Sequence, residues 1–342
     1  MHSGLRRALR CAKTVELRLD WLSNQPEVDA FLRRLSINRR KTCVIATLRR
    51  VGAGGNFRGS LKEQWAGLLA AAEAGCAWCD LEVESAERLD REALGMVRKL
   101  GARLLVSFHD FRRTPADLRS IVGRLDRAGG GAIKLATKCH SLADAARLLS
   151  VARGRRNVIA VPMGEEAIAA RVLALRQGSA LAYAAGGEAT APGQLSFQAM
   201  RETFRANRLD RRTRVYGVIG DPVAHSISPA MHNAGYVARR VNAVYLPFRV
   251  DRSRRALREF LAGARALGVA GFSVTLPQKQ AILRFLGGCD PLAARIGAAN
   301  TVVVRGRGRL YGYNTDYVGV LRALERRVRL RGSRVLLLGA GG

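Results

Sequence analysis

One lysine of the chain is placed where an amine could react with a carbonyl compound. Lys134 lies in the apolar run Ala132–Cys139, which predicts a β-strand. Side chains alternate along a strand, so Ala132, Lys134 and Ala136 share one face, and the two alanines leave room for a ligand. The chain has 58 cationic side chains, of which 7 are lysines and the rest arginines, and only a lysine offers a titratable amine. The alternative interpretation is a lysine near a strand end that reaches solvent.

Other polar side chains are expected at the same end of the predicted sheet. His109 ends the run Leu104–His109, at the carboxyl end of a strand, where barrel enzymes keep their chemistry. Glu16 and Arg18 share a face of an earlier strand, and Arg49 ends the next one. A carboxylate, two guanidinium groups, an imidazole and an amine therefore converge. Neighbouring cations and partial desolvation would lower the pKa of the amine, which is how a lysine becomes a Schiff-base nucleophile.

The elements that must position these groups repeat along the first part of the chain. Apolar runs alternate with helical patterns at a spacing typical of a βα unit, which predicts an α/β protein with a parallel sheet or a (β/α) barrel. A helix is expected at Gly4–Lys13. A closed barrel needs one strand more than the sequence offers. The predicted strands are Val15–Asp20, Cys43–Arg49, Cys79–Val83, Leu104–His109, Ala132–Cys139, Asn157–Pro162 and Ala180–Ala185.

A second α/β pattern follows the charged stretch Asp210–Arg214, where we expect a domain boundary. Its last predicted strand leads into a glycine turn, and such a turn after a strand can hold a dinucleotide phosphate. The predicted strands are Val215–Ile219, Ala243–Val250, Gly271–Thr275, Thr301–Arg305 and Arg334–Leu338, and the turn is Gly339, Ala340, Gly341 and Gly342.

Length and composition limit the class of protein. A chain of 342 residues predicts two domains, and 48% apolar with 25% charged residues is typical of a globular protein. No apolar run is long enough to span a membrane. The six cysteines are irregularly spaced, so we expect no disulfide framework and a reducing cytoplasm. Cys76 and Cys79 lack a second pair of ligands, so no metal site is predicted.

The formal net charge of +31 could indicate a nucleic-acid-binding protein. The arginines are scattered along the chain, however, and no aromatic residues are interleaved with them as in surfaces that stack bases. We therefore expect neither a specific nucleic-acid partner nor a membrane partner, and the sequence leaves the oligomeric state open. A basic nucleic-acid-binding protein remains an alternative, which a steep salt dependence of DNA binding would favour.

About 200 residues at the start of the chain resemble type I 3-dehydroquinate dehydratase through five motifs in order. The resemblance implies a (β/α)8-type, TIM-like barrel over residues 1–208 that lacks its first strand. The motifs are Val15–Asp20 with its Glu-x-Arg, Val106–Pro115, Ile133–Ala136, Met163-Gly164 followed by Arg171, and Thr190–Gln194.

The same resemblance implies the chemistry of the first region. Lys134 would form an imine with the C3 ketone of 3-dehydroquinate, and His109 would remove the C2 proton and then protonate the departing C1 hydroxyl. Arg171 would clamp the substrate carboxylate, and neither a metal nor a cofactor is needed. The other residues expected to bind substrate are Glu16, Arg18, Arg49, Thr190 and Gln194.

The first region departs from this family in two places. Ala53 stands where the family has a glutamate that orients the histidine. The family also begins with a strand ahead of the first helix, whereas Met1 comes directly before the helix expected at Gly4–Lys13. We therefore expect either a start assigned too late or a clipped barrel.

Residues 213–330 resemble the substrate-binding domain of shikimate dehydrogenase. The motifs are Tyr216–Pro229, Gly271–Lys279, Ala298–Thr301 and Gly312–Asp316. The resemblance implies that Lys279 and Asp316 are the acid/base pair and that Ser226, Ser228, Thr275 and Asn300 bind substrate. Two serines that cap a helix are the alternative interpretation of Ser226 and Ser228.

Residues 331–342 resemble the first strand and glycine turn of an NADP-binding domain, with Gly339, Ala340, Gly341 and Gly342 as the cofactor-binding residues. The order of the regions resembles the bifunctional enzymes of the shikimate pathway, in which the first half makes 3-dehydroshikimate and the second reduces it to shikimate with NADPH. We expect a dehydratase joined to a dehydrogenase half that is incomplete and does not transfer hydride. An inactive fragment of such an enzyme is the alternative.

Overall fold

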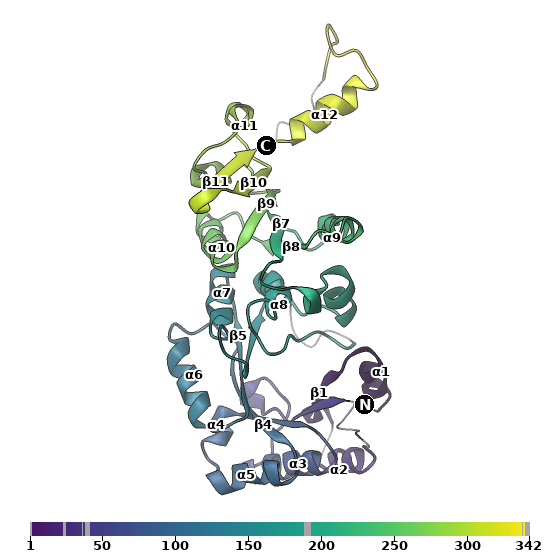
Figure 1. Cartoon of the computed structure of the whole chain (residues 1–342), viewed down its shortest axis with the longest axis vertical. Helices are drawn as coiled ribbons and strands as arrows, with labels where there is room; N and C mark the ends of the chain where they lie inside the picture. Colours follow the sequence, from purple (N-terminus) through teal and green to yellow (C-terminus); the bar gives the residue numbers. More distant parts are fainter. Residues whose placement is uncertain are drawn as a thin grey trace. The chain divides into compact units, whose positions relative to one another are not determined.

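Six parallel strands form the first sheet of the computed structural model, in the order β1-β2-β3-β4-β5-β6. Figure 1 labels β1, β4 and β5 of this sheet. The structure describes residues 2–22, 25–35, 37, 42–187, 193–336 and 338. The strands are β1 (Thr14–Arg18), β2 (Cys43–Thr47), β3 (Trp78–Glu82), β4 (Arg103–Asp110), β5 (Ala132–Lys138) and β6 (Val158–Met163).

Helices connect these strands, and several begin at a side chain that caps the helix. Ser60 Oγ accepts the Glu63 N–H, and the Glu63 carboxylate accepts the Ser60 N–H at 2.6 Å, which fixes the start of α3. Asp90 caps α5 and Asp117 caps α6. The helices are α1 (His2–Cys11), α2 (Gln25–Arg33), α3 (Leu61–Glu73), α4 (Val83–Ala86), α5 (Arg91–Lys99), α6 (Leu118–Arg127), α7 (Leu142–Ser150) and α8 (Ile168–Leu173).

The α/β class, the first helix and six of the predicted strands of the first region are confirmed. The strand predicted at Ala180–Ala185 is wrong, because that segment joins β6 only through the Ala180 N–H, which donates to the Val158 carbonyl. The Ser179 hydroxyl replaces the next rung, since it accepts the Ala160 N–H at 3.1 Å and donates to the Leu181 carbonyl. Ala185 forms only an isolated bridge with Ser196.

The first sheet is curled, as it would be in part of a barrel. Lys134 on β5 lies 3.7 Å from Glu16 on β1, although β2, β3 and β4 separate these strands in the sheet. One end of the concave face carries an apolar layer. The polar residues Thr47, Ser107 and Lys134 each follow a member of this layer by two residues on the same strand, so they lie on the same face. The buried members of the apolar layer are Ile45, Leu105, Ala132 and Ile159, with Trp78, Val161, Leu181 and Tyr183 packed against them.

The second sheet contains five strands in the order β11-β10-β9-β7-β8. β7 pairs in parallel with β8 and β9, whereas β10 pairs antiparallel with β9 and β11. The strands are β7 (Arg214–Gly220), β8 (Ala243–Arg249), β9 (Val269–Val274), β10 (Thr301–Val304) and β11 (Leu310–Tyr313). The helices are α9 (Ser228–Ala238), α10 (Arg254–Leu267), α11 (Pro291–Ile296) and α12 (Asp316–Glu325).

Four of the five strands predicted for the second region are confirmed, and β11 was not predicted. The strand predicted at Arg334–Leu338 is wrong, because residues 334–336 and 338 have no strand structure and their apolar side chains are exposed. A strand needs a neighbour that takes its backbone hydrogen bonds, and the described sheet ends at β11 and β8.

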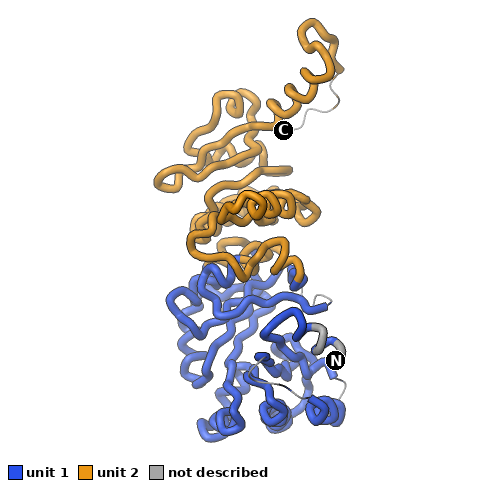
Figure 2. The backbone as a smooth tube through the Cα atoms, turned by 45° about the vertical axis from the view of Figure 1, so that its right-hand side comes forward, with its two compact units in different colours: residues 1–140, 147–164, 173–197 blue, residues 141–146, 165–172, 198–342 orange. Residues whose placement is uncertain are grey.

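The chain divides into two compact units (Figure 2). Unit 1 contains residues 1–140, 147–164 and 173–197, and unit 2 contains residues 141–146, 165–172 and 198–342. The six-stranded sheet belongs to unit 1 and the five-stranded sheet to unit 2. Among the described helices, none is long and apolar enough to cross a bilayer.

Candidate active site

Lys134 is buried on the concave face of the first sheet. It lies between Ser107 of β4 and Ile159 of β6 in the strand register. Its Nζ forms an ion pair with Asp80 and lies 3.7 Å from Glu16 Oε1. The burial excludes the interpretation of a lysine that reaches solvent. The predicted surroundings were partly wrong, because carboxylates rather than cations contact the amine.

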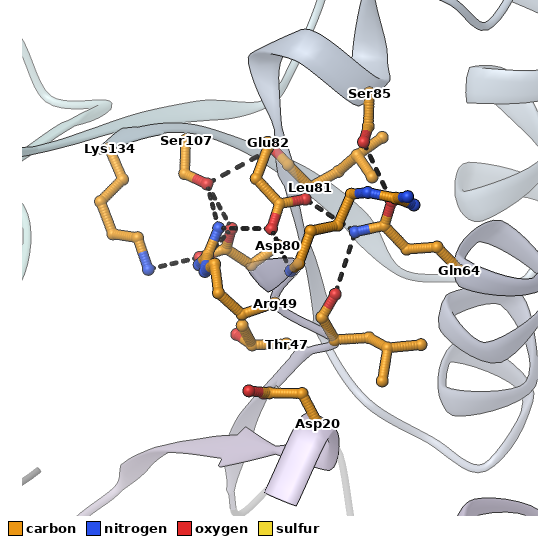
Figure 3. A network of polar contacts seen from close by, with 12 residues as sticks. Asp20, Thr47, Arg49, Gln64, Asp80, Leu81, Glu82, Ser85, Ser107 and Lys134 are labelled. Atoms are coloured by element: carbon orange, nitrogen blue, oxygen red, sulfur yellow. Dashed lines mark hydrogen bonds and ion pairs between the residues drawn. The ribbon is translucent and has the colours of Figure 1, made fainter. Parts of the chain in front are cut away.

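Asp80 of β3 is the centre of the polar cluster (Figure 3). One of its oxygens, Oδ1, lies 2.9 Å from the Arg49 guanidinium and accepts the Ser107 hydroxyl at 2.6 Å. The other oxygen, Oδ2, faces Lys134 Nζ. Burial alone would raise the pKa of Asp80, but the positive charges of Arg49 and Lys134 outweigh burial and hold that pKa far below its ordinary value.

Arg49 follows β2 and is buried, and its terminal guanidinium nitrogens form ion pairs and a hydrogen bond. They contact Asp80, the Ser107 hydroxyl at 2.7 Å and Glu82 at 3.3 Å. Burial alone would lower the pKa of Arg49, but Asp80, Glu82 and Glu16 attract the cation and raise the pKa above its ordinary value. Arg49 therefore holds the buried carboxylates in place.

Further hydrogen bonds fix the Glu82 carboxylate that contacts Arg49. The Gln64 amide donates to Glu82 at 2.7 Å and to the Leu48 carbonyl, while the Ser85 hydroxyl donates to the Gln64 amide oxygen. The Arg50 N–H also donates to Glu82. Buried polar groups that are satisfied in this way keep a fixed geometry.

Glu16 and Arg18 on β1 have separate partners. The Thr47 hydroxyl donates to Glu16 Oε1 at 2.7 Å, so Glu16 belongs to the cluster around Lys134. Arg18 instead donates two hydrogen bonds to Asp20, at 2.8 and 2.7 Å. Asp20 also accepts the Asn56 N–H, which ties the end of β1 to the loop after β2.

His109 lies at the carboxyl end of β4, as predicted, with its ring stacked on Phe111 at 6.0 Å between centroids. Its Nδ1 is buried and has no hydrogen-bond partner among the described residues. Burial, together with the cations Arg49 and Lys134, lowers the pKa of His109 well below its ordinary value, although Asp80 opposes the shift. The imidazole is therefore neutral near pH 7 and can accept a proton.

Ala53 ends the short helical turn Val51–Ala53, which lies close to Phe111, the residue whose ring stacks on His109. Gly54, the following residue, has φ 76°, and a Cβ there would lie 2.3 Å from the Phe111 ring. This contact brings the loop of Ala53 against the aromatic neighbour of His109. The loop that carries position 53 therefore lies one aromatic ring away from the imidazole.

Tyr183 completes the surroundings of the amine, and the sequence did not single it out. Its ring centre lies 5.1 Å from Lys134 Nζ, and its hydroxyl is buried with no partner among the described residues. Burial and then the negative charges of Glu16 and Asp80 raise the pKa of Tyr183 well above its ordinary value.

Three further residues were predicted for the first site. Arg171 lies on α8, in unit 2, and its side chain is buried. Gln194 is part-buried and follows the gap between the described residues 187 and 193. Thr190 lies outside the described residues.

A second polar cluster lies in unit 2. Lys279 Nζ contacts Asp316 at 2.7 Å, and the Asn300 amide donates to Asp316 at 2.6 Å and to the Thr315 hydroxyl at 3.0 Å. Burial would raise the pKa of Asp316, but the hydrogen bonds from Lys279 and Asn300 lower it. The structure therefore brings Lys279, Asp316 and Asn300 together.

The other residues predicted for the second site lie at the ends of secondary-structure elements, and the Thr275 N–H donates to the Ile219 carbonyl. The Ser228 N–H donates to Ser226 Oγ at 3.3 Å, at the start of α9, and Thr275 follows β9. The predicted cofactor residues Gly339, Ala340, Gly341 and Gly342 lie outside the described residues. Within the described part of the chain, no group of three or more His, Cys, Asp or Glu side chains could hold a metal ion.

Sequence reasoning missed Asp80 and Glu82 although their signal is present. Both belong to the strand Trp78–Glu82, and two acids two residues apart on a strand face the same side. Parallel pairing of Thr47 with Asp80 then places them beside Arg49. The missing information was this register.

Comparisons with known proteins agree with the two regions. Residues 1–210 match the family model described as type I 3-dehydroquinase, and residues 218–302 match the shikimate dehydrogenase substrate binding domain. The chain is similar, at 32% identity, to the chloroplastic bifunctional 3-dehydroquinate dehydratase/shikimate dehydrogenase of Arabidopsis thaliana, over 97% of this chain and 57% of that protein.

Two further similarities cover one region each. A shikimate dehydrogenase (NADP(+)) of Thermococcus kodakarensis is 50% identical over 39% of this chain and 48% of that protein. The solved 3-dehydroquinate dehydratase from Aquifex aeolicus is 26% identical with a TM-score of 0.50, and the match covers 59% of this chain and 91% of that one. The chain spans about half the length of the curated relatives it matches.

Proposed function

The chain belongs to the type I 3-dehydroquinase family, and from this premise we propose that its first region dehydrates 3-dehydroquinate to 3-dehydroshikimate through a Schiff base on Lys134. The reaction serves the shikimate pathway. The observation that carries the proposal is a buried amine, paired with carboxylates, on the same concave face as a neutral histidine. We assign residues 1–208 to this dehydratase region.

The proposed reaction begins at the C3 ketone of the substrate. The Lys134 ammonium, paired with Asp80, first gives a proton to the neutral His109, and the free amine attacks the carbonyl carbon. The carbinolamine then takes that proton back as its hydroxyl leaves as water, which gives a protonated imine. The imine draws electrons from the neighbouring carbon, so the neutral His109 can take the C2 proton. The enamine then expels the C1 hydroxyl, which takes a proton from His109 and leaves as water.

Binding contacts would come from groups around the amine. Glu16 lies in the cluster of Lys134, and Arg18 lies on the same strand. Arg49 would affect substrate binding indirectly, because it fixes the carboxylates of Asp80 and Glu82. We keep Arg171, Thr190 and Gln194 as proposed substrate ligands on the strength of their motifs.

A lysine pair on one strand provides the test of this activity. Lys134→Arg keeps the charge but cannot form an imine, so the conjugated product should not appear in an absorbance assay. Lys138→Arg, on the same strand at its half-buried end, should retain activity. Wild-type turnover in Lys134→Arg, or no turnover in the parent chain, would contradict the proposal.

We propose that the second region binds 3-dehydroshikimate for its reduction to shikimate, with residues 213–330 as the substrate-binding domain. The support is the Lys279–Asp316 pair with Asn300, where Lys279 can give a proton to the oxygen of a ketone that is being reduced. Ser226, Ser228 and Thr275 are proposed substrate ligands. Shikimate titrated in calorimetry should bind to the parent chain and more weakly to Lys279→Ala, and equal heats would contradict this assignment.

NADPH is the proposed hydride donor of the second reaction, because the relatives matched there are named for NADP(+). We assign residues 331–342 to the start of its binding domain. Gly339, Ala340, Gly341 and Gly342 lie outside the described residues, so we assign no step to the nucleotide.

For location, we keep the cytoplasm as our proposal. The support is that no disulfide joins any of the six cysteines, all of which are described. The Arabidopsis relative is described as chloroplastic, so fractionation of the source cells would distinguish the two compartments.

A further inference from the structure

Asp80 has no role in the reaction as described so far, yet it is the acid most closely joined to the reacting amine. Its Oδ2 contacts Lys134 Nζ, and this is the shortest ion pair of the amine. Both side chains are buried. Water cannot screen such a pair as it would at the surface, so its electrostatic attraction is strong.

The other contacts of Asp80 keep it negatively charged. Arg49 and the Ser107 hydroxyl both stabilise Oδ1. A carboxylate that has an arginine and a hydrogen-bond donor on one oxygen gains little from binding a proton. The second oxygen is thus a fixed negative charge directed at Lys134.

The two other nearby acids are less suited to pair with the amine. Glu16 lies 3.7 Å from Nζ, and its Oε1 already accepts the Thr47 hydroxyl. Glu82 contacts Arg49 and accepts hydrogen bonds from Gln64 and the Arg50 N–H. Glu82 therefore neutralises the arginine rather than the lysine.

Resting on the proposed function, we propose that Asp80 is the counter-ion of the protonated imine at Lys134, a positioning residue that keeps the imine cationic. The atom balance supports this role. An ammonium and a ketone give a protonated imine and one water, so Nζ carries one positive charge both in the resting state and in the imine. A fixed carboxylate can stabilise both species.

The consequence is that the imine stays protonated as the pH rises. Only the protonated imine is a strong electron acceptor, and it is the form that borohydride reduces. Loss of the Asp80 charge should therefore lower the pH up to which the imine can be trapped. The other charged or titratable groups facing this site are Glu16 and Arg18 from β1, Arg49 after β2, Glu82 on β3, His109 on β4 and Tyr183 after β6.

The test compares Asp80→Asn with Glu82→Gln, since each removes one carboxylate partner of Arg49 but only the first faces Lys134. Each protein is mixed with 3-dehydroquinate and reduced with borohydride from neutral pH to about pH 9.5, and the adduct is quantified by intact-mass spectrometry. Asp80→Asn should lose at least about tenfold in trapping rate at the alkaline end, which corresponds to a fall of one pKa unit or more in the imine. Glu82→Gln should follow the parent profile.

Two outcomes would overturn the role of Asp80. One is a parent-like pH profile in Asp80→Asn, and the other is an equal shift in Glu82→Gln. If Asp80→Asn does not fold, Ser107→Ala keeps every charge but removes the 2.6 Å hydrogen bond to Asp80. A smaller shift in the same direction would then support the role, and no shift would overturn it.

The same experiment separates this inference from the proposed function. If the parent chain gives no adduct with 3-dehydroquinate at any pH, the proposed function fails and the inference fails with it. If the parent gives the adduct on Lys134 and Asp80→Asn matches its pH profile, only the counter-ion role is overturned.

Discussion

The two units each pair a lysine with an aspartate, but in opposite surroundings. In unit 1 the side chains of Lys134 and Asp80 are 5% and 0% exposed, and Asp80 is also held by Arg49 and Ser107. In unit 2 Lys279 and Asp316 are 20% and 51% exposed, and Asp316 is held by Asn300.

Burial determines how strongly the two charges of such a pair interact. A buried pair is hardly screened, and each charge depends on its partners, which suits a fixed counter-ion. An exposed pair is screened by water and salt, so the attraction between its charges is weaker. That suits the proton donor that we propose for the second region.

The largest expected effect is on stability. Asp80→Asn leaves Arg49 and Lys134 without a buried carboxylate and should lower the free energy of unfolding by about 3–5 kcal/mol. Asp316→Asn should lower it by about 1 kcal/mol or less, because the pair is exposed. Urea titration followed by circular dichroism measures both, and the fluorescence of Trp21, Trp65 and Trp78 reports unit 1 alone. Equal losses of unfolding free energy in the two variants would contradict the proposed difference between the buried pair and the exposed pair.

A smaller effect should appear when the pH falls. The folded pKa of His109 lies well below its ordinary value, so below about pH 6.5 the unfolded chain binds a proton that the folded chain does not. Stability of unit 1 should then fall by up to about 1.4 kcal/mol per pH unit.

Two variants isolate this contribution. His109→Gln removes the titrating group and should flatten the acid loss, whereas His140→Gln should keep it because His109 remains. Urea midpoints from tryptophan fluorescence at pH 7 and about pH 5.5 provide the measurement. An unchanged acid loss in His109→Gln would show that another group carries it.

The smallest effect concerns the loop beside His109. Ala53→Glu would place a carboxylate in the surroundings of the imidazole, where it can orient the ring and stabilise its protonated form. The dehydration rate should rise by up to about tenfold, a part of what general acid–base catalysis contributes. Ala53→Gln, without the charge, is the control. A lower dehydration rate, or an unchanged pH profile, would mean that the alanine at position 53 does not impair the action of His109.

Most strands could be predicted because a strand in a parallel sheet is buried on both faces, so it is a short apolar run. β11, an antiparallel strand at the edge of the second sheet, was not predicted. Ala180–Ala185 has the same apolar character, yet the hydroxyl of Ser179 takes the backbone hydrogen bond that a strand would need. Arg334–Leu338 has the composition of a strand but no partner among the described strands. Composition does not report which backbone groups find partners.

The site was predictable where one residue type was informative by itself. Lys134 stood out in an arginine-rich chain, and His109 stood out at a strand end. Asp80 could not be recognised in the same way, because a buried acid is unfavourable until Arg49 is known to lie beside it. That proximity depends on strand register and curling, which bring distant residues together.

The most direct test of the central claim is the identity of the residue that binds the substrate. The parent chain is incubated with 3-dehydroquinate, reduced with borohydride, digested and sequenced by tandem mass spectrometry. We expect one modified residue, Lys134, and no modification of Lys138 or Lys279. An adduct on either of those lysines, or no substrate-dependent adduct, would contradict this claim.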